Sequence, residues 1–242
     1  VILKGGRTEA GTRAANSHTG SLAGSLAIFD AAVRQAGAIR VDRMEELVDS
    51  VVAFRFLRSL RGPRAGIVGG GGGYSVLASD EVASFGLQMP ALSEETQRTL
   101  TEITPTAGTS VRNPVDTSVG WGPQGLKPML DTIRIVADAP NIDFVLYHTS
   151  WSWGPNRSGG PNIIDAATES ATKIGELAAE VGKPIVCVAR IPTTETGMGG
   201  TLAFQQVLAQ HGIAVFNSVQ AASLALQRLL AWQERTEFIG AK

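Results

Sequence analysis

The stretch that decides the fold is IVGGGGGYSVLASDE, residues 67–81. A short apolar run, 65–69, leads into five successive glycines, 69–73, and a helix is predicted from there to about Phe85. A continuous apolar run that is followed at once by a helix is typical of a strand buried in a parallel sheet. The stretch therefore predicts a strand, a glycine turn and a helix, the first unit of an α/β domain.

The same alternation continues to the end of the chain. Further strands are predicted at 87–89, 142–148, 184–191 and 213–216, and further helices at 93–103, 125–138, 163–181, 201–210 and 219–235. Together with the first strand this makes five strands covered by helices, which indicates a doubly wound parallel sheet. We predict a flavodoxin-like α/β domain over residues 62–242.

The first part of the chain, 1–61, follows a different pattern. One strand (1–4) and two helices (25–36 and 42–60) are predicted there, and these elements are too few to close a core of their own. We therefore expect 1–61 to be the C-terminal part of a second α/β domain, and the chain to be a fragment of a longer protein. Gly62 and Pro63 mark the predicted boundary.

Composition excludes several classes of partner. The 242 residues carry a net charge of −1, so no strong field attracts nucleic acid or an anionic membrane. The apolar runs are far shorter than the roughly 20 residues that span a bilayer. The single cysteine, Cys187, lies in an apolar run and is predicted to be a buried structural thiol, which fits a reducing cytoplasm. With no secretory leader recognisable at Val1, we expect a cytoplasmic protein.

The glycine turn suits an anion. Backbone N–H groups converge where a helix begins, so Gly71, Gly72, Gly73, Tyr74 and Ser75 are the predicted phosphate-binding residues. No Lys-Ser or Lys-Thr follows the glycines, as a P-loop requires, and LQMPAL offers no acidic residue for a dinucleotide fingerprint. The alternative is a tight turn that serves packing alone.

A histidine on a segment of small residues is the candidate nucleophile. His18 lies in ANSHTGSLAG, where Ser17 and Thr19 supply hydroxyls and Gly20 supplies flexibility. A neutral imidazole can take a phosphoryl group covalently and divide one difficult transfer into two easier ones. The alternative is an exposed loop histidine, or one that caps the following helix.

These segments resemble a known family. LKGGRTEAGTRAANSHTGSLAGS (3–25), AAVRQAGAIRV (31–41) and MEELVD (44–49) resemble the phosphohistidine segment of the acyl-CoA synthetases (NDP-forming), relatives of succinyl-CoA synthetase. The run from Gly66 to Leu100, with NPVD at 113–116, resembles the ligase-like domain that follows it. The resemblance covers nearly the whole chain.

The resemblance implies a reaction and roles for residues. An acyl-CoA reacts with phosphate to give an acyl phosphate, and a histidine carries the phosphoryl group to ADP held by an ATP-grasp domain. By motif, His18 is that carrier, and the helix after Gly73 is one of the paired helix ends that hold the phosphorylated ring. Asn113 and Asp116 of the RNPVDTS stretch are expected to support the phosphate site, although an Asp after Pro-Val is more often a turn or cap residue. No metal ligands are predicted in this chain.

The resemblance also implies what lies elsewhere. CoA and ATP/ADP with Mg²⁺ are expected to bind mainly to CoA-binding and ATP-grasp domains or subunits, so the chain by itself is expected to be incomplete, and self-association is plausible. The main alternative is a non-catalytic binding or regulatory module of the same fold. A third reading is a flavodoxin-like binder that retains FMN or a nucleotide.

Three further stretches carry polar or aromatic candidates. YHTSWSWGPNRSGGPN, with His148, Trp151 and Trp153, follows a strand and could line an acyl or CoA pocket or pack against another domain. RIPTTETGMGG (190–200) is expected to be a polar loop at the same sheet edge, with a ligand-binding role as the alternative. His211 is expected to be a favourable charge at a helix end.

Overall fold

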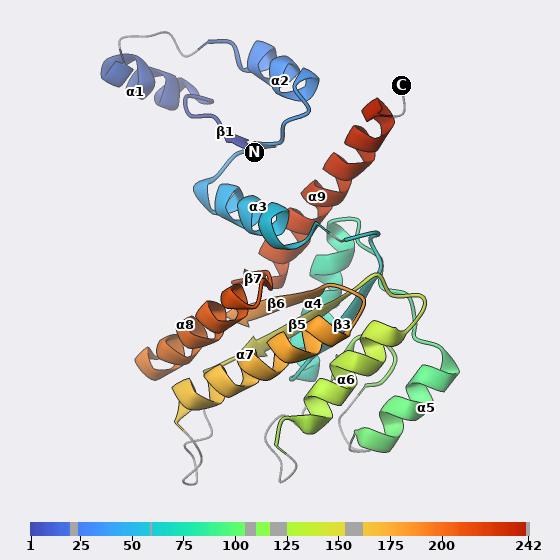
Figure 1. Cartoon of the computed structure of the whole chain (residues 1–242). Helices are drawn as coiled ribbons and strands as arrows, with labels where there is room; N and C mark the ends of the chain where they lie inside the picture. Colours follow the sequence, from blue (N-terminus) through green and yellow to red (C-terminus); the bar gives the residue numbers. More distant parts are fainter. Residues whose placement is uncertain (20–23, 59, 105–109, 117–124, 153–161, 241–242) are drawn as a thin grey trace.

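The centre of the molecule is a five-stranded parallel sheet. A computed structural model describes residues 1–19, 24–58, 60–104, 110–116, 125–152 and 162–240 (Figure 1). The strands are β3 (Ala65–Gly69), β4 (Val115–Asp116), β5 (Phe144–Ser150), β6 (Ile185–Arg190) and β7 (Val215–Phe216), in the order β4-β3-β5-β6-β7. The first strand of this domain therefore pairs with the second and the third, which is the flavodoxin-like order. The predicted fold class is confirmed.

Helices cover both faces of this sheet. They are α4 (Gly72–Ser84), α5 (Glu94–Ile103), α6 (Lys127–Asp138), α7 (Ile163–Glu180), α8 (Glu195–Gln210) and α9 (Val219–Gly240). One buried apolar cluster contains Leu100, Ile133, Ile174 and Phe204 from α5, α6, α7 and α8. A second cluster, on the other face, joins α4 and α9 to β3, β5 and β6. Both faces of the strands are buried, which is why the strands read as continuous apolar runs.

The second strand of the sheet is not where the sequence predicts it. No strand forms at 87–89, where Gln88 makes only an isolated bridge with Arg64, and β4 pairs with β3 instead. The side chain of Asn113 occupies the rest of that edge of β3: its Oδ1 accepts a hydrogen bond from the Ile67 N–H, and its Nδ2 donates to the Ala65 carbonyl, both at 2.9 Å. This edge of the sheet is completed by one side-chain amide and a strand of two residues. Neither forms an apolar run, so the sequence pattern does not reveal this strand.

The N-terminal part forms a small parallel pair of strands with three helices. β1 (Ile2–Leu3) pairs with β2 (Arg40–Val41), and the helices are α1 (Glu9–Thr19), α2 (Leu26–Gln35) and α3 (Met44–Phe56). Neither α1 nor β2 is predicted from the sequence. α3 packs against α9, with Ala53 in the second apolar cluster and the Phe54 ring 5.1 Å from that of Trp232. The division at residue 62 stays a prediction, and α3 lies against the second of the two predicted domains.

Candidate functional site

The glycine turn forms the centre of a site at the carboxyl edge of the sheet. Gly71, the N-cap residue of α4, has φ 100°, a conformation that favours glycine. Its N–H donates to Asp116 Oδ1 at 3.1 Å, and Asp116 is buried at the end of β4. The N–H of Ser75 donates to the Gly71 carbonyl within the helix. Of the predicted phosphate-binding residues, Gly72, Gly73 and Tyr74 therefore supply the N–H groups of the first turn, and Ser75 has its hydroxyl to offer.

A buried histidine stands beside this turn. His148, on β5, is fully buried, and its Nε2 lies 3.3 Å from Ser75 Oγ. The ring lies so close to β3 that a Cβ on Gly69 would stand 2.3 Å from it. Burial, with a smaller effect from the charge of Arg190, lowers the pKa of His148 to about 4. The imidazole is therefore neutral at pH 7, and its Nδ1 has no hydrogen-bond partner among the described residues.

Arg190 supplies the positive charge of the site. It ends β6, where it pairs in register with Ser150 of β5. Its guanidinium carbon lies 3.9 Å from the centre of the Tyr74 ring, and that ring contacts His148 edge-on at 4.9 Å. Burial raises the pKa of Tyr74, and the charge of Arg190 opposes that shift. A guanidinium and free N–H groups beside one turn suit a phosphoryl anion.

His18 lies elsewhere. The sequence predicts it on a loop, and the structure places it in the last turn of α1, with its side chain exposed. The neighbouring Ser17 hydroxyl donates to the Ala14 carbonyl at 2.8 Å. The side chain of Thr19 and the whole of Gly20 lie outside the described residues. Figure 1 shows α3 between α1 and the sheet. The structure thus brings Gly71–Ser75 and Asp116 together but leaves His18 apart from them.

Asn113 acts through the backbone. It has φ 89°, and besides its two bonds to β3 its Nδ2 donates to the Pro90 carbonyl at 2.9 Å. These contacts hold the start of β4 against β3, and the register Gly69 to Asp116 places the Asp116 carboxylate beside the glycine turn. Asn113 therefore supports the candidate site indirectly, by fixing the position of β4 and of Asp116.

The other candidate residues that the structure describes are buried in the core or lie at a helix end. Trp151 is buried against Phe204, with ring centres 5.6 Å apart, and Trp153 lies outside the described residues. His211 is the C-cap residue of α8. Burial raises the pKa of the Cys187 thiol, so this group stays protonated at neutral pH.

The described residues contain no group of three or more His, Cys, Asp or Glu side chains that could hold a metal ion. Among the same residues, no helix combines the length and the apolar character that crossing a membrane requires.

Sequence reasoning included Arg190 only as the first residue of a predicted polar loop, 190–200, and gave His148 only a general role as a lining residue. The loop prediction was wrong over much of its length, because Arg190 ends β6 and α8 already begins at Glu195. A polar residue at the end of an otherwise apolar strand was the available signal for both Arg190 and His148, because the carboxyl ends of parallel strands meet at one edge of the sheet.

Comparisons with known proteins identify the family of the chain. Residues 1–54 match the family profile described as the succinyl-CoA ligase like flavodoxin domain. Over 238 residues the chain is 37% identical to the acetate–CoA ligase [ADP-forming] I subunit alpha of Pyrococcus furiosus. This alignment covers 97% of this chain and 46% of that protein. The chain belongs to the acyl-CoA synthetase (NDP-forming) family.

Two further relatives also align over only part of their own length. The 4-hydroxybutyrate–CoA ligase [ADP-forming] of Nitrosopumilus maritimus is 33% identical over 76% of this chain and 24% of its own length. The structure of Ca. Korarchaeum cryptofilum dinucleotide forming acetyl-coenzyme A synthetase 1, in complex with phosphate and ADP, superposes with a TM-score of 0.69 at 26% identity, over 99% of this chain and 48% of that one. The chain therefore spans less than half the length of these synthetases.

Proposed function

We propose that this chain contributes the phosphohistidine segment and the ligase-like domain of an NDP-forming acid–CoA ligase, which catalyses acyl-CoA + phosphate + ADP ⇌ acid + CoA + ATP. The observation that carries the proposal is the exposed imidazole of His18 in the Ser-His-Thr-Gly motif. A nucleophile that takes a phosphoryl group from a donor and passes it to an acceptor must be accessible to both. The side chain of His18 is exposed, whereas that of His148 is buried.

The chemistry assigned to His18 consists of two displacements. A neutral ring nitrogen attacks the phosphorus of an acyl phosphate, the bond to the acyl oxygen breaks, and the carboxylate leaves. An oxygen of the ADP β-phosphate then attacks the phosphohistidine, the P–N bond breaks, and ATP and the free imidazole result. The acyl phosphate itself comes from attack of phosphate on the thioester, which releases CoA.

The phosphorylated ring needs a positive environment that its own helix does not supply. His18 stands in the last turn of α1, where the helix dipole is negative and disfavours a dianion. The first turn of α4 and the Arg190 guanidinium have the opposite sign, and each helix end contributes roughly 0.3–1 kcal/mol. We therefore assign Gly72, Gly73 and Ser75 to the phosphoryl group, with Asp116 ordering the turn.

The two parts must meet for this to happen. Because α3 lies between α1 and the sheet, His18 reaches the glycine turn only if the N-terminal part changes position, or if a second copy or subunit supplies the turn (Figure 1). CoA and ATP/ADP with Mg²⁺ belong in this proposal to CoA-binding and ATP-grasp domains or subunits, so the chain alone completes no cycle. The free thiol of Cys187 suits a reducing compartment and supports the proposed cytoplasmic location.

Labelling tests the proposal. The chain, combined with the domains or subunits that supply the CoA and nucleotide sites, is incubated with [γ-³²P]ATP. We expect a phosphoryl adduct that is labile in acid and stable in base, and that His18→Asn abolishes. His211→Asn is the matched control, because His211 caps α8 outside the proposed site, and it should label like the wild type.

The alternative remains a non-catalytic binding module of the same fold. One observation favours it: α3 exposes an apolar face, with Met44, Val48 and Val51 each more than half exposed. Failure of every acyl phosphate and nucleotide donor to label the wild-type protein would support the module and contradict the carrier role of His18.

A further inference from the structure

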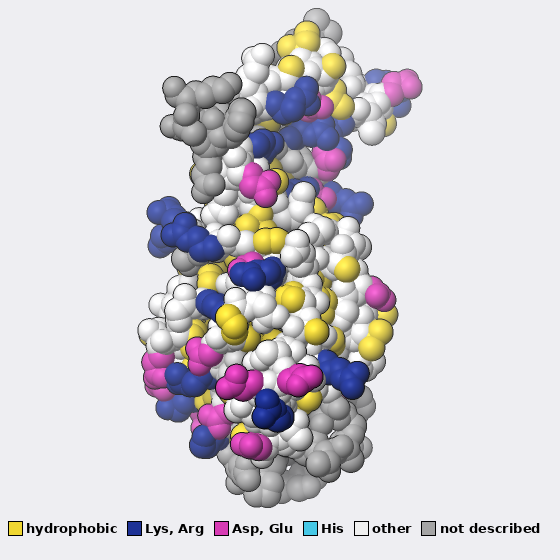
Figure 2. Space-filling model, turned by 90° about the vertical axis from the view of Figure 1, so that its right-hand side faces the viewer, with side chains coloured by type: hydrophobic (Ala, Val, Ile, Leu, Met, Phe, Trp, Pro, Cys, Tyr) yellow, Lys and Arg dark blue, Asp and Glu magenta, His cyan; other side chains and the backbone are white. Residues whose placement is uncertain are grey.

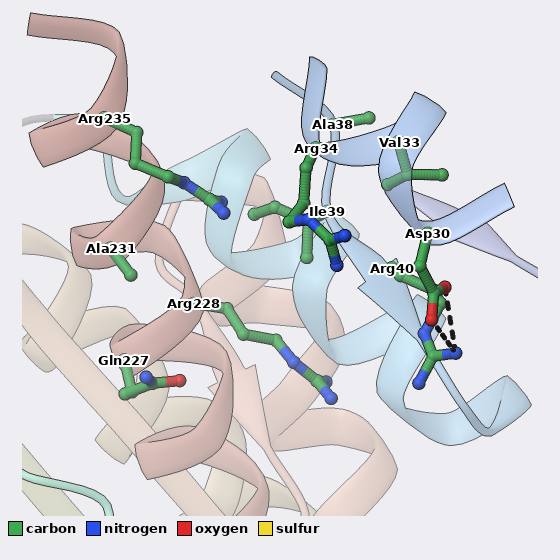
Figure 3. Close-up of a pocket in the computed structure, with 10 residues that line it drawn as sticks. All are labelled: Asp30, Val33, Arg34, Ala38, Ile39, Arg40, Gln227, Arg228, Ala231 and Arg235. Carbon is green, nitrogen blue, oxygen red and sulfur yellow. Dashed lines mark hydrogen bonds and ion pairs between the residues drawn. The ribbon is translucent and has the colours of Figure 1, made fainter. Parts of the chain in front are cut away.

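A cavity lined by positive charge lies between the N-terminal part and α9. This cavity of about 330 Å³ opens between α2, β2 and α9, and four arginines line it: Arg34, Arg40, Arg228 and Arg235 (Figure 3). Asp30 is the acidic residue in this lining. The lining residues come from α2, the following segment and α9, and Figure 1 shows α2 on the opposite side of α3 from α4, so the cavity is separate from the site described above.

The spacing of large and small side chains along α9 helps to form the cavity. Arg228, Ala231 and Arg235 are three and four residues apart, so they share one face of the helix. The short side chain of Ala231 leaves space between two long ones, and Val33 and Ile39, both buried, lie across from it. Figure 3 shows Arg228 and Arg235 extending from α9 toward the segment that carries Arg34 and Ile39.

The charges of this cavity are only partly neutralised. Arg40 pairs with Asp30 and with Asp42, both at 3.1 Å. Arg228 pairs with Glu46 at 2.7 Å, and both side chains are less than one-fifth exposed. The guanidinium groups of Arg34 and Arg235, in contrast, make no hydrogen bond or ion pair with any other described residue.

Two unpaired guanidinium groups at the mouth of one cavity raise the local potential and favour an anion. Figure 2 shows several Lys and Arg side chains in the upper part of this face, with Asp and Glu side chains among them.

We propose that this cavity binds a phosphate-bearing small molecule through Arg34 and Arg235. A guanidinium presents parallel N–H groups that match two phosphate oxygens, which a point charge does not do. The paired Arg228 and Arg40 form the inner wall and add donors. The volume is at the lower end for small-molecule sites, so it fits a phosphate or diphosphate group rather than a whole nucleotide. A free anion and the diphosphate of a larger cofactor share this chemistry.

Titration calorimetry of the 242-residue chain with inorganic pyrophosphate tests the proposal. We expect binding at the cavity that weakens with added salt, because exposed charges are screened. Arg34→Gln and Arg235→Gln should each weaken binding about tenfold, the loss that follows from one charge-assisted hydrogen bond. Arg98→Gln, which removes the same charge from exposed α5, is the matched control and should bind within twofold of the wild type.

Further arms identify the source of the anion. If ADP or CoA binds more tightly than pyrophosphate with the same dependence on Arg34 and Arg235, the ligand is an organic diphosphate; if neither does, it is the free anion. The Ser75→Ala variant distinguishes binding at the cavity from binding at the glycine turn, because only binding at the glycine turn should change. Wild-type affinity in both arginine variants overturns the proposal. The proposal is also overturned if a hexaglutamate peptide binds through these arginines and pyrophosphate does not. The cavity would then recognise an acidic protein segment.

Discussion

His18 and His148 are the same side chain in opposite surroundings. His18 is exposed on a helix that makes few contacts with the rest of the chain, whereas His148 is buried at the carboxyl edge of the sheet, against Gly69, Tyr74 and Ser75. Burial makes the second imidazole a neutral, fixed group, while the first keeps the access that a phosphoryl carrier needs. Chemistry and packing are thus assigned to different histidines, and each can be changed separately.

The largest expected effect comes from filling the space that His148 occupies. In Gly69→Ala the new Cβ would stand 2.3 Å from the imidazole, between two paired strands that cannot separate. We expect a loss of about 3 kcal/mol in the free energy of unfolding, measured by urea denaturation. Gly182→Ala meets no atom within 4 Å and should change stability by less than about 1 kcal/mol. Equal effects of the two variants would contradict the packing described here.

The pH dependence of stability is the next largest effect. The folded-state pKa of His148, about 4, lies below the unfolded value of about 6.5, so the unfolded state binds the proton first as the pH falls. Stability is therefore full above pH 6.5, decreases below it and levels off below pH 4. Between pH 7.5 and pH 5 we expect the wild type to lose about 2 kcal/mol more than His148→Gln. His18→Gln, at an exposed position, should lose as much as the wild type. A parallel pH profile for His148→Gln would mean that His148 titrates normally.

A smaller effect should separate the N-terminal part from the sheet. The Trp232 indole N–H donates to the Gly37 carbonyl at 3.0 Å and ties the end of α2 to α9. Trp232→Phe keeps the ring contact with Phe54 and removes this bond, at a cost of about 1 kcal/mol. Hydrogen exchange should become about fivefold faster for amides in residues 1–41 and stay unchanged for those of β5. Uniform acceleration would indicate that the two regions unfold together.

The smallest expected effect on stability belongs to the residue with the largest expected effect on chemistry. His18→Asn alters an exposed side chain, so the free energy of unfolding should change by less than about 0.5 kcal/mol. A thermal or urea unfolding curve beside the labelling experiment measures both properties. A large loss of stability would mean that His18 has packing contacts in the folded chain, and the absence of an adduct would then need another explanation.

Patterns of different kinds decided which parts could be predicted. Long apolar runs identified β3, β5 and β6, because a strand buried on both faces needs apolar residues at every position. α1 gave no such signal, since its sequence, EAGTRAANSHT, has no apolar face. What supports it is local: the Thr8 hydroxyl accepts the Gly11 N–H at 3.1 Å, Glu9 pairs with Arg13, and alanines favour the helix. β4 was missed because two residues and the Asn113 amide complete that edge.

The sequence by itself determined the alternation of strands and helices, the glycine turn that begins α4 and the motif that contains His18, because each depends on neighbours along the chain. Only the tertiary structure decided that Asp116, His148 and Arg190 meet at that turn, that His18 does not, and that Arg34 and Arg235 line one cavity. Those relations join residues from separate elements, and strand register and helix packing, which no local pattern specifies, bring them together or keep them apart.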